Sequence, residues 1–347
     1  MANKPASLSE IIKAMNSKSK EEVVSYGLPS YDYERIPFTS PRMNYCSFGG
    51  IPKRMLTEFF GEEHGGKTTS ALDIIANYQQ MDDGRPVLYV DAENTLDTKW
   101  AEKLGVDTSE DKFICFNPTT QSAEEIFEFI QQAVDSGEIG LWVLDSIPAL
   151  SSAQELEKSI EDKTYAGVSA PLTVFCRKVE KSCHQRDCTG IFINQIRAEM
   201  NAAYPGAMKT PGGQALKHFC TVRMEFRKGK YIDEDGNELN SRAESPAGNY
   251  VLMSMVKNKS CPPTRRTGFY TLNYQYGVDY LKDLVDLAIK NGFIEKSGAW
   301  YNIFNPSTGE IVKKVQGQAG VNKFLEDEEN EEVLTAIEEA INNIIKL

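Results

Sequence analysis

Residues 61–68 match the pattern G-x-x-x-x-G-K-[ST] of a phosphate-binding loop. In such a loop, backbone N–H groups surround the β-phosphate, Lys67 would reach the β- and γ-phosphates, and the hydroxyl of Thr68 would bind Mg²⁺. An apolar stretch typical of a strand precedes the loop at 55–60, and a stretch with helical spacing follows at 69–76. Because the pattern also occurs by chance, this strand–turn–helix context is what favours a nucleoside triphosphate site over a glycine turn between core elements.

Three acids follow apolar stretches and are candidates for the chemistry. Asp145 closes the stretch 140–144, where a carboxylate that holds Mg²⁺ is expected; the alternative is that it caps a helix. Asp91 and Glu93 follow the stretch 86–90, and ligands bind at the carboxyl ends of strands in parallel sheets. Hydrolysis needs a base that orients or deprotonates the attacking water. Glu93 is the better candidate because its longer side chain can reach the γ-phosphate, but spacing alone leaves Asp91 open.

A polar amide closes a further apolar stretch, because 190–193 is followed by Asn194 and Gln195. An amide at this position can sense the γ-phosphate and pass its state to the segment that follows. That segment, from Arg197 to Lys209, has no strong periodicity, and prolines and glycines interrupt it and the residues beyond. A long loop that leaves a catalytic edge favours nucleic-acid contact. An ordinary surface loop remains the alternative.

The elements that must position these residues alternate along the chain. Short apolar stretches at 86–90, 113–116, 140–144, 190–193 and 221–226 are separated by helical stretches such as 122–136 and 171–183. This alternation predicts an α/β fold with a mostly parallel sheet and helices on both faces. We expect a β-hairpin excursion at 229–249 and further strands at 250–257 and 268–274.

The two ends of the chain have their own patterns. Residues 8–16 have the spacing of a short amphipathic helix, and the stretch that follows through about residue 42 is interpreted as a tether plus the entry into the main domain. Helical spacing resumes near 281, and a closing acidic helix is expected at about 331–346. The sequence therefore predicts three parts: an N-terminal helix and tether (1–38), a main domain (39–278) and a small α/β lobe (279–347).

Composition is that of a globular protein without a membrane anchor. The 347 residues are 41% hydrophobic and 25% charged, and no apolar run approaches the ~20 residues needed to cross a bilayer. Seven cysteines without framework spacing suit a reducing cytosol, so we expect a cytoplasmic protein. Cys183, His184 and Cys188 offer three metal ligands, but no second pair accompanies them, and buried thiols are the favoured interpretation.

The net charge of −12 does not exclude a nucleic-acid partner. Residues 323–347 hold eight acids and two lysines, a net charge of −6 and half of the imbalance. Local loops, rather than the total charge, make phosphate contacts.

Taken in order, the motifs resemble one family closely, the bacterial RecA recombinases. The resemblance is nearly continuous from about residue 55 to 325. Besides the loop, it rests on Asp91-Ala92-Glu93, Asp145-Ser146, Asn194-Gln195-Ile196-Arg197, Gly212-Gly213, Lys257-Asn258-Lys259 and Gly298-Ala299-Trp300-Tyr301. It implies a RecA-like P-loop ATPase core that polymerises on single-stranded DNA, hydrolyses ATP with Mg²⁺, and exchanges strands with homologous duplex DNA.

The resemblance also implies roles for individual residues in nucleotide binding and hydrolysis. Glu93 would activate water, with Lys67 on the phosphates, and Gln195 would couple the γ-phosphate to the DNA-binding loop. Lys257 and Lys259 would reach ATP on the neighbouring subunit of a helical filament. The implied nucleotide contacts are Gly61, Glu62, Glu63, His64, Gly65, Gly66, Lys67, Thr68, Thr69, Asp97, Trp100, Asp145 and Tyr274, with Thr68 and Asp145 on the metal.

The implied DNA contacts lie in two loops. A first loop near 157–167 would be followed by a helix that carries Arg177. The second would contribute Arg197, Tyr204, Gly212 and Gly213.

Some segments depart from the family pattern. Ala170-Pro171 stands about where the family has a phosphate-binding arginine, residues 40–44 match poorly, and the excursion at 229–249 is longer than usual. Such divergence would fit a phage-borne copy.

Two other classes of protein share this core. A ring helicase predicts unwinding without homologous pairing, and the lysine pair at Lys257 and Lys259, in place of a trans-acting arginine, weighs against it. A regulatory ATPase or kinase predicts turnover that single-stranded DNA does not change.

Overall fold

The computed structural model describes residues 7–18, 24, 33–81, 83–158, 167–198, 208–234 and 236–346. The chain divides into two units, Met1–Glu34 and Arg35–Leu347. Within the described residues, no helix has the length and apolar character of a membrane span.

The first unit contains the expected short helix, α1 (Leu8–Asn16). The hydroxyl of Ser7 accepts a hydrogen bond from the backbone N–H of Glu10, and the Glu10 carboxylate accepts one from the N–H of Ser7. This reciprocal pair is a capping box, which satisfies N–H groups that the helix leaves unpaired. Leu8, Ile11 and Met15 give α1 an apolar side, and the prediction of an amphipathic helix over 8–16 is confirmed.

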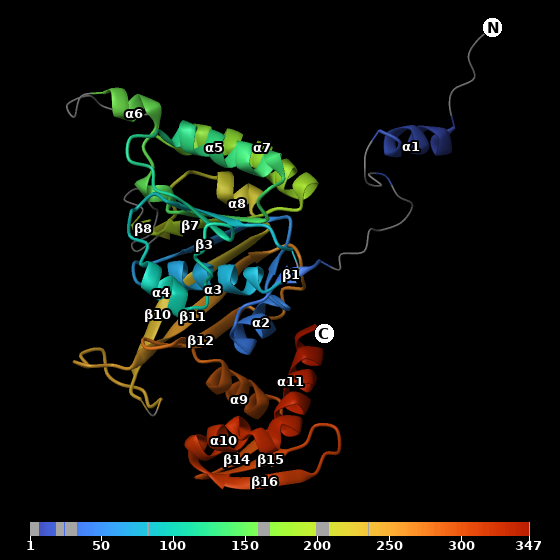
Figure 1. Cartoon of the computed structure of the whole chain (residues 1–347), viewed down its shortest axis with the longest axis vertical. Coiled ribbons are helices and arrows are strands. Elements are labelled where there is room, and N and C mark those ends of the chain that lie inside the picture. Colours follow the sequence, from blue (N-terminus) through green and yellow to red (C-terminus); the bar gives the residue numbers. More distant parts are fainter. Residues whose placement is uncertain are drawn as a thin grey trace. The chain divides into compact units, whose positions relative to one another are not determined.

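The second unit is built on a large sheet (Figure 1). Among the described residues, nine strands form it in the order β13-β12-β11-β10-β3-β7-β6-β4-β5. The strands from β10 to β5 are parallel, whereas β11, β12 and β13 are added in antiparallel fashion. The predicted α/β fold with a mostly parallel sheet is confirmed. The strands are β3 (Leu56–Gly61), β4 (Val87–Asp91), β5 (Phe113–Phe116), β6 (Leu141–Asp145), β7 (Thr189–Gln195), β10 (Val222–Ile232), β11 (Gly248–Asn258), β12 (Thr267–Asn273) and β13 (Gly277–Val278).

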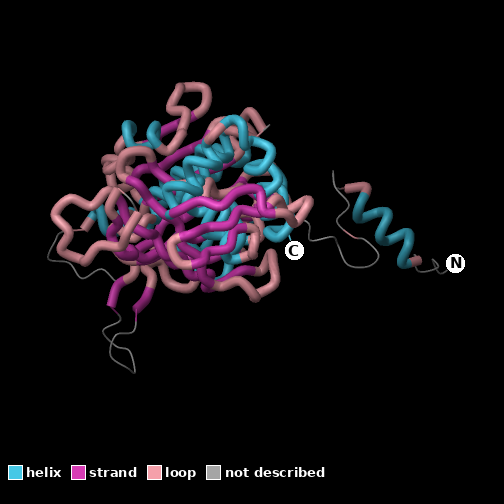
Figure 2. The backbone as a smooth tube through the Cα atoms, turned by 90° about the horizontal axis from the view of Figure 1, so that it is seen from below, coloured by secondary structure: helices cyan, strands magenta, loops and turns pink. Residues whose placement is uncertain are grey.

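Helices cover both faces of this sheet because side chains alternate along each strand. In β6, Val143 packs into a cluster with α3, whereas Trp142 and Leu144 pack into a second cluster with α5 and α7. Figure 1 shows α3 on one side of β3 and β7, and α5 and α7 on the other, and Figure 2 shows the magenta strands side by side with cyan helices next to them. The helices of this part are α3 (Lys67–Gln79), α4 (Thr98–Lys103), α5 (Ala123–Ser136), α6 (Ala153–Glu157), α7 (Ser169–Arg186) and α8 (Ala215–Phe219), with a 3₁₀ turn at Ile147–Ala149.

The structure adds detail at two places that the sequence left undivided. The stretch interpreted as tether and entry into the main domain contains a short strand pair, β1 (Arg35–Ile36) with β2 (Ile51–Pro52), and the start of a helix, α2 (Pro41–Ser47). Ser40 caps α2 by accepting from the N–H of Met43, and proline at the first helical position favours a helix start. The excursion is also shorter than 229–249, because β10 continues to Ile232 and β11 resumes at Gly248.

The C-terminal lobe has a sheet of its own. Strands β14 (Ile294–Ser297), β15 (Trp300–Phe304) and β16 (Ile311–Gln316) pair in antiparallel fashion. Helices α9 (Tyr280–Lys290), α10 (Gly317–Glu326) and α11 (Glu331–Lys346), with a 3₁₀ turn at Glu328–Asn330, share a hydrophobic cluster with this sheet. The predicted acidic helix at 331–346 is therefore confirmed.

Polar contacts join the lobe to the main sheet. The hydroxyl of Ser40 donates to the buried Asp283 carboxylate at 2.5 Å, and Arg42 pairs with Asp286 at 2.5 Å. The Arg265 guanidinium donates to the carbonyls of Ile344 and Ile345 at the end of α11. A basic group is favourable there because the last carbonyls of a helix have no partner within it.

Candidate nucleotide and DNA sites

The phosphate-binding pattern forms a tight turn between β3 and α3. Gly61 has φ 151° and Gly66 has φ 92°, which favour glycine. A Cβ atom on Gly61 would lie 2.0 Å from the carbonyl oxygen of Phe226, and one on Gly66 would lie 2.8 Å from Cγ1 of Val251. The glycines therefore let the turn pass close to β10 and β11, and the first-turn N–H groups of α3 are left available for an anion.

Lys67 is buried and folded back onto the turn. Its ammonium donates to the carbonyls of Glu62 at 2.6 Å and Gly61 at 3.3 Å. Burial lowers the pKa of Lys67, and the nearby carboxylates, Asp145 and Glu93 foremost, oppose that shift. The ammonium is thus held beside the turn by carbonyls that an incoming phosphate could replace as its partners.

Thr68 and Asp145 meet, as the sequence predicts. The Thr68 hydroxyl donates to Oδ2 of Asp145 at 2.7 Å, and the hydroxyl of Tyr89 donates to the same oxygen at 2.8 Å. The pKa of Asp145 is raised to about 6, chiefly by burial and to a smaller extent by the nearby Glu93 and Asp91, while the hydroxyls of Thr68 and Tyr89 oppose the rise. A carboxylate in these surroundings is stabilised as an anion by a cation placed next to it.

The geometry separates the two candidate bases. Asp91 is 2% exposed, and its oxygens accept from the backbone N–H groups of Thr95 and Leu96 at 3.2 and 2.9 Å, so this carboxylate shapes the turn after β4. Glu93 is exposed, and its Oε1 accepts from the Ser146 hydroxyl and, at 3.1 Å, from the Gln195 amide. Of the two acids, only Glu93 extends into the cavity.

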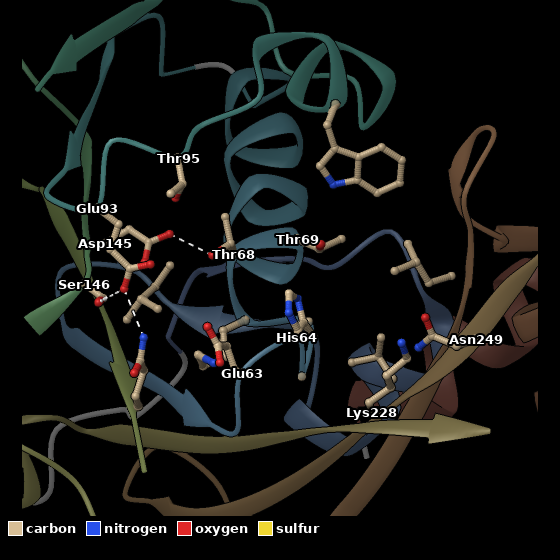
Figure 3. A pocket seen from close by; sticks show the side chains of 18 of the residues that line it. Glu63, His64, Thr68, Thr69, Glu93, Thr95, Asp145, Ser146, Lys228 and Asn249 are labelled. Atoms are coloured by element: carbon tan, nitrogen blue, oxygen red, sulfur yellow. Dashed lines mark hydrogen bonds between the residues drawn. The ribbon is translucent and has the colours of Figure 1, made fainter. Parts of the chain in front are cut away.

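These side chains line a cavity of about 630 Å³, within the range of sites that hold a nucleotide-sized ligand. Figure 3 shows Glu93 and Asp145 beside Thr68, with Lys228 and Asn249 across the cavity. The predicted residues that line it are Glu63, His64, Gly65, Gly66, Lys67, Thr68, Thr69, Glu93, Trp100, Asp145, Gln195 and Tyr274.

Three of the predicted nucleotide contacts do not belong to this lining. Gly61 ends β3 and Glu62 begins the turn, and the carbonyls of both accept from Lys67. Asp97 caps α4, because its carboxylate accepts from the N–H groups of Lys99 and Trp100 at 2.9 and 3.2 Å.

Lys228 and Asn249 belong to the cavity lining but were missed from the sequence. Asn249 accepts a hydrogen bond from the hydroxyl of Tyr274 at 2.6 Å. The ammonium of Lys228 donates to the hydroxyl of Tyr231 at 2.8 Å. Both residues lie on the β10–β11 hairpin, and no motif marks them. The register of β10 against β3, where Phe226 pairs with Gly61, and the pairing of β11 with β10 together bring them to the loop.

A second cavity, of about 350 Å³, lies where β7 leads into the predicted DNA-binding segment. Arg197 in β8 (Arg197–Ala198) pairs with Lys209 in β9 (Met208–Lys209). The cavity brings together Ser169, Arg197, Lys209, Thr210, Pro211, Gly212 and Gly213. Two basic residues and two glycines thus converge, as an anion site requires.

Two other predicted DNA contacts are placed differently. Arg177 is exposed on α7 and is not part of this cavity. Tyr204 lies outside the described residues, as does most of the predicted first loop.

A buried amide connects the two cavities. Asn194 is 0% exposed, and its Nδ2 donates to Oε1 of Glu58 at 3.0 Å and to the carbonyl of Pro211 at 3.1 Å. The N–H of Gln195 donates to Oδ1 of Asn194 at 3.0 Å. The strand end that carries Gln195 is therefore tied to the residue that precedes Gly212.

Lys257 and Lys259 lie at the other end of the strands. In the sheet, Lys257 pairs with Arg223 and Arg223 with Glu58, before the strand reaches the phosphate loop. The ammonium of Lys257 donates to the carbonyls of Lys217 and His218 at 2.7 and 3.1 Å. β11 has 11 residues, so at about 3.3 Å per residue its two ends are roughly 30 Å apart.

The candidate metal ligands Cys183, His184 and Cys188 do not converge. Both thiols are buried in the cluster beneath α7, and Trp142 donates to the Cys183 sulfur at 3.4 Å. His184 is exposed.

Comparison with known proteins identifies the fold. Residues 8–279 match the RecA N-terminal domain and residues 282–346 match the RecA C-terminal domain. The chain belongs to the RecA family. It is 33% identical to protein RecA of Streptomyces rimosus over 95% of this chain and 79% of that protein. It is 36% identical to protein RecA of Pseudomonas syringae pv. syringae over 85% and 77%, and 34% identical to that of Paracoccus denitrificans over 84% and 76%.

The activity of the protein follows from its membership in the RecA family. The protein is a DNA-dependent ATPase that binds single-stranded and duplex DNA, forms filaments, and catalyses strand exchange between homologous DNAs. RecA proteins use ATP with Mg²⁺, and the described residues fit both. A hydroxyl and a carboxylate are the oxygen ligands that Mg²⁺ prefers, and the contact between Thr68 and Asp145 brings them to the phosphate loop.

Proposed function

We propose that the cavity at the carboxyl ends of β3, β4, β6 and β7 hydrolyses ATP and reports its γ-phosphate to the DNA-binding segment. The observation that carries this proposal is the 3.1 Å hydrogen bond from the Gln195 amide to Glu93. It joins the candidate base to the strand that leads into the DNA cavity. A change at the γ-phosphate that moves Glu93 therefore also changes the partner of Gln195.

Binding begins with the phosphate loop. The N–H groups at the start of α3 hold the β-phosphate, and Lys67 exchanges the carbonyls of Gly61 and Glu62 for phosphate oxygens. The carbonyl contacts keep the ammonium next to its target, so little reorganisation is required. On the base side we assign Asp97, Trp100 and Tyr274 to the nucleotide.

Glu93 is the catalytic base. Its carboxylate accepts a proton from the water whose oxygen attacks the γ-phosphorus, while the bond to the β–γ bridging oxygen breaks and ADP leaves. Ser146 and Gln195 both donate to Oε1, so Oε2 is the oxygen available to the water. Thr68 and Asp145 would hold Mg²⁺, which would supply positive charge to offset negative charge on the phosphates.

Coupling to DNA follows the connection from Gln195 through Asn194 to Pro211. Arg197, Gly212 and Gly213 contact the DNA backbone together with Lys209, and Arg177 and Tyr204 contribute from α7 and the second loop. Each contact is an electrostatic phosphate contact and is sensitive to salt. Many such contacts along a filament give affinity without one basic surface.

Lys257 and Lys259 act on the nucleotide of the neighbouring subunit. Their distance from their own cavity supports this assignment, since two ammonium groups stabilise transition-state charge only when they are adjacent to it. We propose residues 1–38 as an assembly segment, 39–278 as the ATPase core and 279–347 as a separate lobe. We assign the protein to the cytoplasm.

The direct test of the catalytic assignment is Glu93→Gln. We expect ATP-dependent binding of single-stranded DNA to remain and turnover to fall about 10²–10⁴-fold, the usual contribution of a general base. ATP hydrolysis with and without single-stranded DNA, and joint-molecule formation with homologous duplex, measure both. Glu295→Gln, an exposed acid on β14, is the control. Normal turnover in Glu93→Gln would refute the assignment.

A further inference from the structure

The Asp145 carboxylate accepts a hydrogen bond from Tyr89, a side chain that has no part in the proposed mechanism. The hydroxyl of Tyr89 donates to Oδ2 of Asp145 at 2.8 Å. Tyr89 comes from β4, the strand next to β6, and is 1% exposed. Its ring lies against Phe113 of β5, with centroids 5.9 Å apart and an interplanar angle of 26°.

We propose that Tyr89 is a positioning residue that fixes the Asp145 carboxylate toward the Mg²⁺ site, an inference that rests on the metal role proposed for Asp145. Two hydroxyl groups, those of Thr68 and Tyr89, share Oδ2. With that oxygen engaged, the other oxygen of the carboxylate is the one free to serve the cation.

The two hydroxyls differ in what happens when nucleotide and cation bind. The Thr68 hydroxyl belongs to the phosphate loop and is itself assigned to the cation, so it gives up Asp145 as its acceptor. Tyr89 is buried in β4 and is not part of the cavity lining, and it keeps its contact. Asp145 therefore has one partner that changes and one that does not.

Burial keeps Tyr89 suited to this task. The pKa of Tyr89 is well above its ordinary value, because burial and the neighbouring Asp145 both oppose the phenolate. Partners of metal-binding side chains typically affect metal affinity about 10–100-fold when they are removed.

Tyr89→Phe tests this inference, since it removes only the hydroxyl and keeps the ring against Phe113. The measurement is the affinity of the full-length protein for a non-hydrolysable ATP analogue, by calorimetry without DNA. One titration contains Mg²⁺ and the other contains EDTA. The readout is the factor by which Mg²⁺ raises the affinity, so it does not depend on turnover.

We expect Tyr89→Phe to lower this Mg²⁺ factor about tenfold or more, with affinity in EDTA unchanged. Tyr78→Phe is the matched control. Tyr78 is also 1% exposed, but it lies in the last turn of α3, at the opposite end of the helix from Thr68. It should keep the wild-type factor.

The remaining outcomes separate the inference from the function on which it rests. An unchanged Mg²⁺ factor in Tyr89→Phe, or a loss of affinity that is equal in Mg²⁺ and EDTA, overturns the positioning role. Asp145→Asn is measured in parallel. If it also leaves the Mg²⁺ factor unchanged, the metal assignment of Asp145 itself fails; if it lowers the factor and Tyr89→Phe does not, only the inference about Tyr89 fails.

Discussion

The two ends of the strands in the large sheet are equipped differently. At the carboxyl end, Glu93, Asp145 and Lys67 all have polar partners from the same chain. At the other end, Lys257 and Lys259 are two cations close together, and their repulsion adds to burial in lowering the pKa of Lys257. The carboxyl end gathers acids and Lys67 around one cavity, whereas the other end presents two lysines, of which Lys257 is held by the carbonyls of Lys217 and His218.

The difference indicates how the subunits assemble. If the cavity end of one subunit contacts the lysine end of the next, the contact is head-to-tail. Head-to-tail contacts that do not close into a ring form helical filaments. The carboxyl end of one subunit and the lysine end of the next would then make one complete site. Nucleotide binding would belong to the single subunit, and rapid hydrolysis to the filament.

The largest expected effect on turnover, and the strongest test of this difference between the two ends, is that of the double variant Lys257→Ala/Lys259→Ala. DNA-dependent turnover should fall roughly 10³–10⁵-fold, as when a trans-acting cation is removed from a phosphoryl-transfer site. Nucleotide affinity of the isolated subunit should not change. A mixture with Glu93→Gln should regain activity, because about a quarter of the interfaces then pair an intact cavity with intact lysines.

The control mixture combines Glu93→Gln with Asp145→Asn. Both defects lie at the carboxyl end, so every interface contains one of them and no activity should return. If the lysine variant likewise fails to restore Glu93→Gln, the lysines do not act across the interface.

An intermediate effect is expected in the DNA cavity that follows β7. Arg197→Ala should weaken binding of single-stranded DNA about tenfold and reduce the slope of log affinity against log salt by about 0.7, the loss of one phosphate contact. Arg177→Ala should do less, because Arg177 lies outside the cavity. Arg242→Ala, an exposed position in the excursion, is the control in fluorescence anisotropy titrations. Equal losses for all three would mean that the cavity has no special role.

The smallest effect on activity, less than about twofold, is expected far from both strand ends. Asp283, at the junction with the lobe, has a pKa raised to about 7 by burial, although Ser40, Arg42 and Thr271 oppose the shift. A carboxyl whose pKa is raised on folding adds stability below its unfolded pKa, and this is lost as the pH rises through its folded value.

The measurement is urea unfolding of the wild type and Asp283→Asn between pH 4 and pH 8. Relative to the variant, the wild type should lose roughly 2–4 kcal/mol of unfolding free energy as the pH rises from 4 to 7, and the difference should then level off. A difference that does not vary with pH would contradict a raised pKa for Asp283.

The parts of the site that could be predicted from sequence are local or follow from the sheet. The phosphate loop is encoded within residues 61–68. Asp145 and Gln195 end parallel strands, and the carboxyl ends of parallel strands all lie at the same edge of the sheet. Glu93 could be preferred over Asp91 only by length. The structure adds that Asp91 is engaged by backbone N–H groups.

What could not be predicted depends on long-range register. Lys228 and Asn249 reach the cavity because a hairpin that starts more than a hundred residues after the loop pairs with β3. Tyr89 looks like any strand residue until β4 and β6 are placed side by side. The helix α2 was missed because Ser40 and Pro41 suggest a break, although the same two residues also start helices.

The central claim is that Gln195 carries the state of the γ-phosphate to the DNA-binding segment, and one measurement tests it most directly. The affinity for single-stranded DNA is measured with a non-hydrolysable ATP analogue and with ADP, in the wild type and in Gln195→Ala. The account predicts that the ratio of the two affinities is well above one in the wild type and close to one in the variant. A variant whose affinity still responds to the nucleotide as the wild type does would contradict the account.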